Sequence, residues 1–244
     1  MNRTLAEWQA HFRRIYGRRN NYFISLEKRF TRLLVACRQL GETLRKDQHG
    51  ITAYCLADVF AWLMAVANYF DDLPLPEAFA FKWSGSACSY CGKRPCECHK
   101  DRPPRHQRFN KKDWCVDSEN GRLYGRTLRE SQVALENIYG LANHQSGGVT
   151  VCLNRIFMEI GEMGAIVGGA DIFPGLSVDH LEMNYALECA DVISWLLSLA
   201  NLIRIDLNQA IETRYFPGCP ECRRCPCDCG TLVLEQSQFG TGAA

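Results

Sequence analysis

Hydrophobic residues recur along most of the chain at the three- and four-residue spacing of amphipathic helices. Four stripes are clear, namely Trp8, Phe12, Ile15 and Tyr16; Leu33, Leu34, Cys37 and Leu40; Val59, Trp62, Leu63, Val66 and Ala67; and Leu128, Val133, Leu135 and Ile138. Further helices are predicted over 151–163 and 181–203, and the second is apolar on several sides, which is typical of the centre of a bundle. Alternating strand patterns are essentially absent, so the sequence predicts an all-α fold.

The two halves of the chain repeat one another. TLAEWQ at 4–9 returns as TLRESQ at 127–132, and ADVFAWL at 57–63 returns as ADVISWL at 190–196. Self-similarity of this kind indicates a duplicated structural unit. We therefore expect two tandem helical-bundle repeats packed as a pseudo-dimer.

Each repeat ends in four cysteines with the spacing C-x2-C-x4-C-x-C. Cluster 1 is Cys88, Cys91, Cys96 and Cys98; cluster 2 is Cys219, Cys222, Cys227 and Cys229, with Cys225 left over. Closely spaced thiols in a chain without an export signal are more often metal ligands than disulfides or iron–sulfur ligands. Four thiolates suit tetrahedral Zn²⁺ in a closed, structural site. We expect two structural zinc ions per chain, one in each zinc knuckle.

The other cysteines have no partner at ligand spacing, and we expect them to be small buried apolar residues. They are Cys37, Cys55, Cys115, Cys152 and Cys189.

Bulk composition narrows the class of protein. The 244 residues are 47% hydrophobic and carry a formal net charge of +1, which argues against wholesale nucleic-acid or membrane binding. The longest apolar stretch, 192–205, is interrupted by Asn201 and Arg204 and is too short to span a bilayer. No signal peptide is visible at the N-terminus, so the sequence predicts a cytoplasmic protein.

Composition also marks the expected boundaries. The first repeat with its knuckle covers 1–99, a basic linker covers 100–115, the second repeat with its knuckle covers 116–235, and a disordered tail covers 236–244. The basic linker is typical of a solvated connector, although it could also attract phosphates. Ser177 is a plausible N-cap for the long helix that follows.

Acidic residues distinguish the second half from the first. Glu159 and Glu162 lie three apart on one predicted helix, and Glu188 and Asp191 lie three apart on another, so each pair shares a helix face. Four carboxylates facing an apolar interior are unfavourable unless a hard cation neutralises them, and all-oxygen ligation favours Mg²⁺ or Mn²⁺. The alternative is that these acids lie on a wet surface and make only local contacts.

The corresponding positions of the first half are Gln39, Glu42, Cys55 and Asp58. Two of the four acids are missing there. We therefore expect the first repeat to be a catalytically silent scaffold.

These motifs resemble the MazG branch of the all-α nucleoside triphosphate pyrophosphohydrolases. The resemblance is carried by EIGE at 159–162, ECADVISWL at 188–196 and ANLIRIDL at 200–207, since the family's signature is E-x-x-E followed by E-x-x-D on a neighbouring helix. It extends over 127–216 and, in weaker form, over 4–83.

The resemblance implies Mg²⁺-dependent hydrolysis of a nucleoside triphosphate to a monophosphate and pyrophosphate, with the active site in the second repeat. Glu159, Glu162, Glu188 and Asp191 would be the catalytic residues and metal ligands, with Glu162 the candidate general base. Family members assemble from two or more such units, so a homodimer of this chain is expected.

Three residues are candidates for substrate binding, and two of them also have a structural alternative. Asn201 suits a hydrogen bond to sugar or base, or a polar helix contact. Trp195 suits stacking on a base, although a core position is the commoner role. Arg214 is the nearest candidate for the phosphate-binding basic residue near the end of the family's last helix, and Lys82 stands at a similar place in the first repeat.

Two other functions fit the same sequence. The chain could be a non-catalytic nucleotide sensor or assembly subunit that keeps the bundle and acts through its knuckles. It could also be a nucleic-acid-binding protein, because basic residues such as Lys93 and Arg223 adjoin the cysteines. The near-neutral charge makes the second alternative less favoured.

Overall fold

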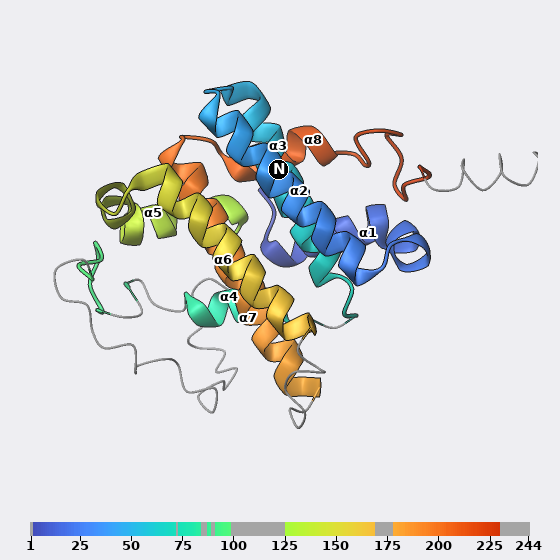
Figure 1. Cartoon of the computed structure of the whole chain (residues 1–244), viewed down its shortest axis with the longest axis horizontal. Coiled ribbons are helices and arrows are strands. Elements are labelled where there is room, and N and C mark those ends of the chain that lie inside the picture. Colours follow the sequence, from blue (N-terminus) through green and yellow to red (C-terminus); the bar gives the residue numbers. More distant parts are fainter. Residues whose placement is uncertain are drawn as a thin grey trace, which may run out of the picture. The chain divides into compact units, whose positions relative to one another are not determined.

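A computed structural model describes residues 2–71, 73–83, 87–88, 91–98, 125–168 and 178–229. Over these residues the chain forms eight α-helices and no strand beyond an isolated bridge between Thr4 and Thr127. The helices are α1 (Leu5–Phe23), α2 (Leu26–Arg45), α3 (His49–Ala67), α4 (Leu75–Lys82), α5 (Leu128–Gln145), α6 (Gly148–Gly168), α7 (Val178–Leu202) and α8 (Leu207–Tyr215) (Figure 1). The predicted all-α class is confirmed. The linker 100–115, the tail 236–244, Cys115 and Ser177 lie outside the described residues.

The helices form two compact units, and each unit draws on both halves of the chain. Unit 1 lies within Met1–Ala6 and Asp72–Asn208, and unit 2 lies within Glu7–Asp71 and Gln209–Ala244. Accordingly α4 packs against α7 in unit 1, whereas most of α8 belongs with α1, α2 and α3 in unit 2. The compact units therefore differ from the continuous ranges 1–99 and 116–235, because the short helix that ends each half packs with helices of the other half.

Helix α7 is the centre of unit 1. It packs against α4, α5 and α6, and its residues Val192, Ile193 and Leu196 are fully buried. Burial of an apolar side chain of this size stabilises the fold by about 1.5–3 kcal/mol. Helix α7, which is apolar on several sides, therefore lies at the centre of its unit, as the sequence predicts.

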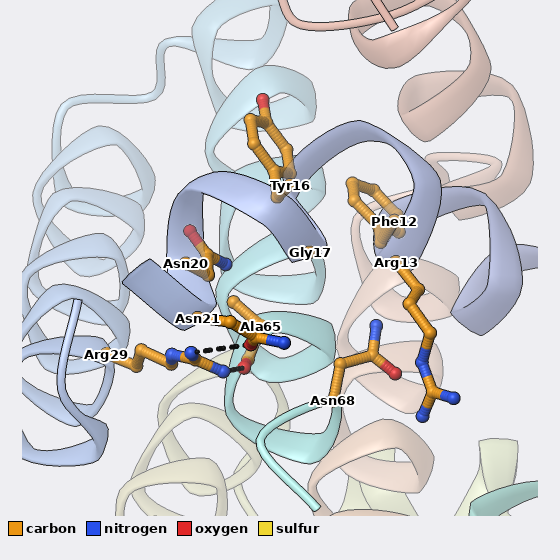
Figure 2. Close-up of a pocket in the computed structure, with 9 residues that line it drawn as sticks. All are labelled: Phe12, Arg13, Tyr16, Gly17, Asn20, Asn21, Arg29, Ala65 and Asn68. Atoms are coloured by element: carbon orange, nitrogen blue, oxygen red, sulfur yellow. Dashed lines mark hydrogen bonds between the residues drawn. The ribbon is translucent and has the colours of Figure 1, made fainter. Parts of the chain in front are cut away.

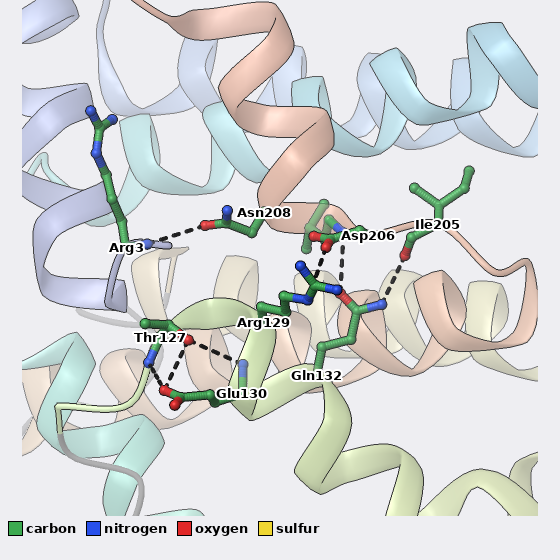
Figure 3. Close-up of polar contacts among 9 residues, drawn as sticks. Arg3, Thr127, Arg129, Glu130, Gln132, Ile205, Asp206 and Asn208 are labelled. Atoms are coloured by element: carbon green, nitrogen blue, oxygen red, sulfur yellow. Dashed lines mark hydrogen bonds and ion pairs between the residues drawn. The ribbon is translucent and has the colours of Figure 1, made fainter. Parts of the chain in front are cut away.

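Helix α5 begins with a capping box. The side chain of Thr127 accepts a hydrogen bond from the backbone N–H of Glu130 at 3.2 Å, and the carboxylate of Glu130 accepts one from the backbone N–H of Thr127 at 2.8 Å (Figure 3). This reciprocal pair satisfies two donors that a helix N-terminus otherwise leaves unpaired.

Gln132 of α5 holds the turn that follows α7. Its side-chain amide donates to the carbonyl of Ile205 at 2.8 Å (Figure 3). The same amide accepts a hydrogen bond from the backbone N–H of Leu207 at 3.1 Å. Its own carbonyl accepts a hydrogen bond from Asn201 of α7 at 2.9 Å. Gln132 is buried, so these bonds replace water and fix where α8 begins.

Aromatic residues of α1 form the core of unit 2. Phe12 is buried, and its ring centroid lies 6.0 Å from that of Phe60 on α3 and 5.0 Å from that of Tyr215 on α8. Asn68 donates to the carbonyl of Gln9 at 3.1 Å, as Asn201 does to the carbonyl of Gln132 in unit 1.

A buried arginine ties α2 to α3 in the same unit. The guanidinium of Arg29, 1% exposed, donates to the carbonyl of Ala65 at 3.0 Å and to the side chain of Asn21 at 3.2 Å (Figure 2). It also lies 5.0 Å from the centroid of the Tyr69 ring. A small hollow beside it is lined by Phe12, Arg13, Tyr16, Gly17, Asn20, Asn21, Arg29, Ala65 and Asn68.

Two positions assigned to apolar stripes are exposed. Leu34 is 45% exposed while Leu33 is fully buried, and Val133 is 55% exposed while Leu135 is buried. Leu34 directly follows Leu33, about 100° further round the helix, and Val133 lies two residues before Leu135, about 200° away, so neither shares the face of its buried neighbour. Those two predictions were therefore wrong.

Of the described helices, only α3 is by itself long and apolar enough to cross a membrane, and α7 with α8 pass the same test jointly despite a bend of 102° between them. In α3, 61% of the qualifying stretch is buried inside the protein. The core helix of a water-soluble bundle has the same length and composition.

The turn held by Gln132 gives the first prediction. We expect Gln132→Ala to lower the free energy of unfolding by about 1–3 kcal/mol, because the N–H of Leu207 and the carbonyl of Ile205 lose their partner. The exposed Gln145→Ala on the same helix is the control and should change it by less than about 0.5 kcal/mol. Equal effects of the two variants in urea denaturation would contradict this role for Gln132.

Candidate metal sites

Both four-cysteine clusters are assembled in the structure. In each, all four sulfur atoms lie within 4.8 Å of one another, and no described cysteine is in a disulfide. The Sγ–Sγ distance is 3.6 Å for Cys88 and Cys98 and 3.8 Å for Cys219 and Cys229. Sulfurs held about 2.3 Å from a tetrahedral Zn²⁺ lie about 3.8 Å apart. The donor atoms and their spacing therefore fit a zinc ion, and both clusters can bind metal.

Each of the two clusters contains the same kind of backbone turn. The N–H of Gly92 donates to the carbonyl of Cys88, and the N–H of Arg223 donates to the carbonyl of Cys219, both at 2.8 Å. The residue that donates this bond is left-handed in each cluster, with φ of 67° at Gly92 and 60° at Arg223. Glycine adopts this conformation freely, whereas an arginine is strained by about 1–2 kcal/mol.

Each cluster is anchored to a helix. In unit 1 the N–H of Cys96 donates to the carbonyl of Ile138 on α5, and in unit 2 the N–H of Cys227 donates to the carbonyl of Ile15 on α1, both at 2.7 Å. Ile138 and Ile15 are also buried against the cysteines of their cluster. Both clusters therefore join a hydrophobic core.

The other cysteines follow the sequence prediction where they are described. Cys37, Cys55, Cys152 and Cys189 are buried, and burial raises the pKa of the Cys152 thiol to about 11. Cys225 is exposed and lies outside cluster 2.

A third group of candidate ligands lies between α6 and α7. Carboxylate oxygens of Glu159, Glu188 and Asp191 lie within 4.8 Å of one another, and all three residues are half-buried. We call these three residues the acidic cluster. Glu162 is exposed and is not part of this group. Burial and the charge of nearby Glu162 both raise the pKa of Glu159.

A lysine from the first half of the chain faces the acidic cluster. The ammonium of Lys82, at the end of α4, contacts the Asp191 carboxylate, and their side chains are 16% and 23% exposed. Burial lowers the pKa of Lys82, while the charges of Glu188 and Glu159 oppose that shift. In the sequence, Lys82 was singled out because it stands near the end of the last helix of the first repeat, as Arg214 does in the second.

The residue after Lys82 was not predicted to matter. The indole N–H of Trp83 donates to the hydroxyl of Ser194 on α7, and its ring meets that of Tyr139 edge-on at 5.3 Å. Trp83 thereby fixes the end of α4 against α7 and α5. A single tryptophan after a short helix carries no sequence signal for this role.

Trp195 borders the acidic cluster. Its indole N–H donates to Glu159 at 3.2 Å, and the guanidinium of Arg155 lies 5.8 Å from the centroid of its ring. Asn201, by contrast, donates to the carbonyl of Gln132. Its side-chain amide therefore makes the polar helix contact that was the alternative to binding sugar or base.

Arg214 pairs with the first-half acid. Its guanidinium makes two hydrogen bonds to Asp58, one of 2.9 Å to Oδ2, and the Tyr215 hydroxyl donates to Oδ1 at 2.6 Å. Burial alone would lower the pKa of Arg214, but Asp58 raises it well above its ordinary value. Asp58 therefore already has a protein cation as its partner. The other acid of the first half, Glu42, makes an ion pair of 2.7 Å with Lys46 at the surface.

No protein-family model, curated protein or solved structure matches the chain. The class of protein that fold and sites define is an all-helical protein with two four-cysteine clusters capable of binding metal.

The cysteine clusters predict the metal content. We expect mass spectrometry of the reduced, freshly purified chain to find about two zinc ions, and about one in Cys96→Ser. Cys225→Ser is the matched control and should retain two, because this thiol lies outside cluster 2. A zinc content near zero in the unmodified chain would remove the assignment.

Repulsion within the acidic cluster predicts an unusual stability effect. Without added divalent cations, Glu159→Gln should raise the free energy of unfolding by about 1 kcal/mol, because it removes one of three like charges and Lys82 offsets only part of their repulsion. The surface variant Glu42→Gln should change it by less than about 0.5 kcal/mol. A clear loss of stability in Glu159→Gln would show instead that the three charges are already balanced.

Proposed function

We propose that this chain is a divalent-metal-dependent nucleoside triphosphate pyrophosphohydrolase whose active centre is the acidic cluster of unit 1. The observation that carries the proposal is the convergence of Glu159, Glu188 and Asp191 from two helices, with Lys82 beside them. Three half-buried carboxylates at this separation are costly for a fold unless they serve to bind a cation.

The donor set suits a hard metal ion. Carboxylate oxygens are the ligands that Mg²⁺ and Mn²⁺ prefer, and Glu159, Glu188 and Asp191 would hold the ion. A bound Mg²⁺ offsets the negative charge of a triphosphate and lowers the pKa of a coordinated water.

Other residues of unit 1 suit the remaining tasks. Lys82 contacts Asp191, and Arg155 lies near the Trp195 ring that borders the acidic cluster, so both could supply positive charge to a triphosphate. Glu162 stays outside the group of three, so its carboxylate is available to accept the proton of an attacking water. The Trp195 ring gives the cluster an aromatic wall on which a base could stack.

The proposed reaction adds water across the anhydride between the α- and β-phosphates. The α-phosphate keeps the hydroxyl oxygen and becomes a nucleoside monophosphate, and pyrophosphate leaves. This is the chemistry of the MazG-like family that the sequence resembles, and the second repeat would perform it.

The first repeat is proposed to be silent. Gln39 and Cys55 replace two acids, and Arg214 with Tyr215 already engages Asp58. The matched amide contacts of Asn68 and Asn201 support a tandem duplication of one bundle.

Pyrophosphate release tests the proposal. The zinc-loaded chain should release pyrophosphate from at least one member of a panel of ribo- and deoxyribonucleoside triphosphates with Mg²⁺. Glu188→Gln and Asp191→Asn should each reduce the rate by at least about 100-fold, equivalent to about 2.7 kcal/mol of lost transition-state stabilisation. Glu42→Gln in unit 2 is the matched control and should keep full activity.

Other outcomes discriminate between the functions. Nucleotide binding without pyrophosphate release would favour a sensor. Salt-sensitive retention of oligonucleotides without turnover would favour nucleic-acid binding. Activity that persists in both Glu188→Gln and Asp191→Asn would locate the chemistry elsewhere.

A further inference from the structure

Cluster 1 and the acidic cluster are joined by a continuous series of contacts within unit 1. The first link is the docking of cluster 1 on α5. The N–H of Cys96 donates to the carbonyl of Ile138, and Tyr139, the next residue, packs against the buried cysteines. Four thiolates drawn to one ion would fix this surface relative to α5.

Trp83 is the second link. Its ring lies edge-on to Tyr139 with an interplanar angle of 78°, and its indole N–H donates to Ser194 on α7. Ser194 is buried and donates to the carbonyl of Ala190 at 2.7 Å, next to Asp191. Trp83 therefore contacts both the helix under cluster 1 and the helix that carries the acids.

Lys82 is the last link. It directly precedes Trp83, and its ammonium contacts Asp191. Helix α4 has only eight residues, and a helix of that length is marginal in water without tertiary contacts. The place of the ammonium consequently depends on what holds the C-terminal end of α4.

We propose that a metal ion in cluster 1 positions Lys82 over the acidic cluster, with Trp83 as the positioning residue that transmits the constraint. A metal ion in cluster 1 then keeps the Lys82 ammonium against the acidic cluster. A divalent cation that binds there must therefore compete with this positive charge. The effect on catalysis rests on the proposed function, whereas the effect on α4 does not.

Unit 2 contains the control for this proposal. Cluster 2 docks on α1 through Cys227 and Ile15, and the residue that corresponds to Lys82, Arg214, binds Asp58 in that unit. Loss of cluster 2 should accordingly leave α4 and the acidic cluster unchanged.

The experiment compares zinc-loaded, full-length Cys96→Ser with Cys227→Ser. Hydrogen exchange is measured on the amides of α4 and Trp83, whose N–H donates to the carbonyl of Phe79. Exchange there should become at least about tenfold faster in Cys96→Ser and stay unchanged in Cys227→Ser.

Mn²⁺ affinity is the second readout. Lys82→Met removes a positive charge beside three carboxylates and should tighten Mn²⁺ binding by at least about fivefold. Cys96→Ser and Trp83→Phe should shift the affinity in the same direction, and Trp83→Phe should do so while it retains two zinc ions. If Trp83 had only a structural role, Trp83→Phe would not tighten Mn²⁺ binding as Lys82→Met does.

Each outcome has a distinct meaning. Equal α4 exchange in both cysteine variants would overturn the coupling. If Cys96→Ser also speeds exchange throughout α7, the zinc-retaining Trp83→Phe decides, and an unchanged Mn²⁺ affinity in it overturns the proposal. Selective loosening of α4 in a protein that binds no Mn²⁺ and releases no pyrophosphate would leave the coupling standing and refute the proposed function.

Discussion

Repulsion among three carboxylates is the constraint on which the account of this protein depends. Glu159, Glu188 and Asp191 are gathered within 4.8 Å in a half-buried site, where each charge loses hydration and is pushed by the other two. Lys82 relieves that repulsion only in part. A cation bound among the carboxylates would relieve the rest of the repulsion, and for this reason the proposed function requires a divalent metal ion.

The exchanged short helices bring a basic residue to a different set of acids in each unit. In unit 1 a flexible lysine from α4 meets an acidic cluster, whereas in unit 2 the rigid guanidinium of Arg214 meets a single aspartate, Asp58. A planar guanidinium binds a carboxylate through two parallel bonds, and a lysine ammonium does not. In unit 2 one guanidinium therefore faces one carboxylate, whereas in unit 1 a single ammonium faces a group of three.

Much of the fold could be predicted from the sequence, because helical periodicity, duplicated motifs and cysteine spacing are local signals. The helices and the cysteine clusters follow from them, and so does the meeting of the two acidic pairs, although three of the four predicted carboxylates group together and Glu162 does not. The exchange of α4 and α8 between the halves could not be predicted, since a repeat shows which segments correspond and not which ones pack together. The contacts of Lys82 and Trp83 depend on that exchange. The spacing places Glu159 and Glu162 on one helix face, and only the packing of α6 shows that Glu159 is half-buried and Glu162 exposed.

A crystal structure of the zinc-loaded chain with Mn²⁺ and a non-hydrolysable nucleoside triphosphate would show whether the three carboxylates hold a metal ion. The anomalous signal of manganese should lie among the carboxylates of Glu159, Glu188 and Asp191, with the triphosphate against it. Manganese bound elsewhere, with these carboxylates still contacting only protein cations, would contradict the account.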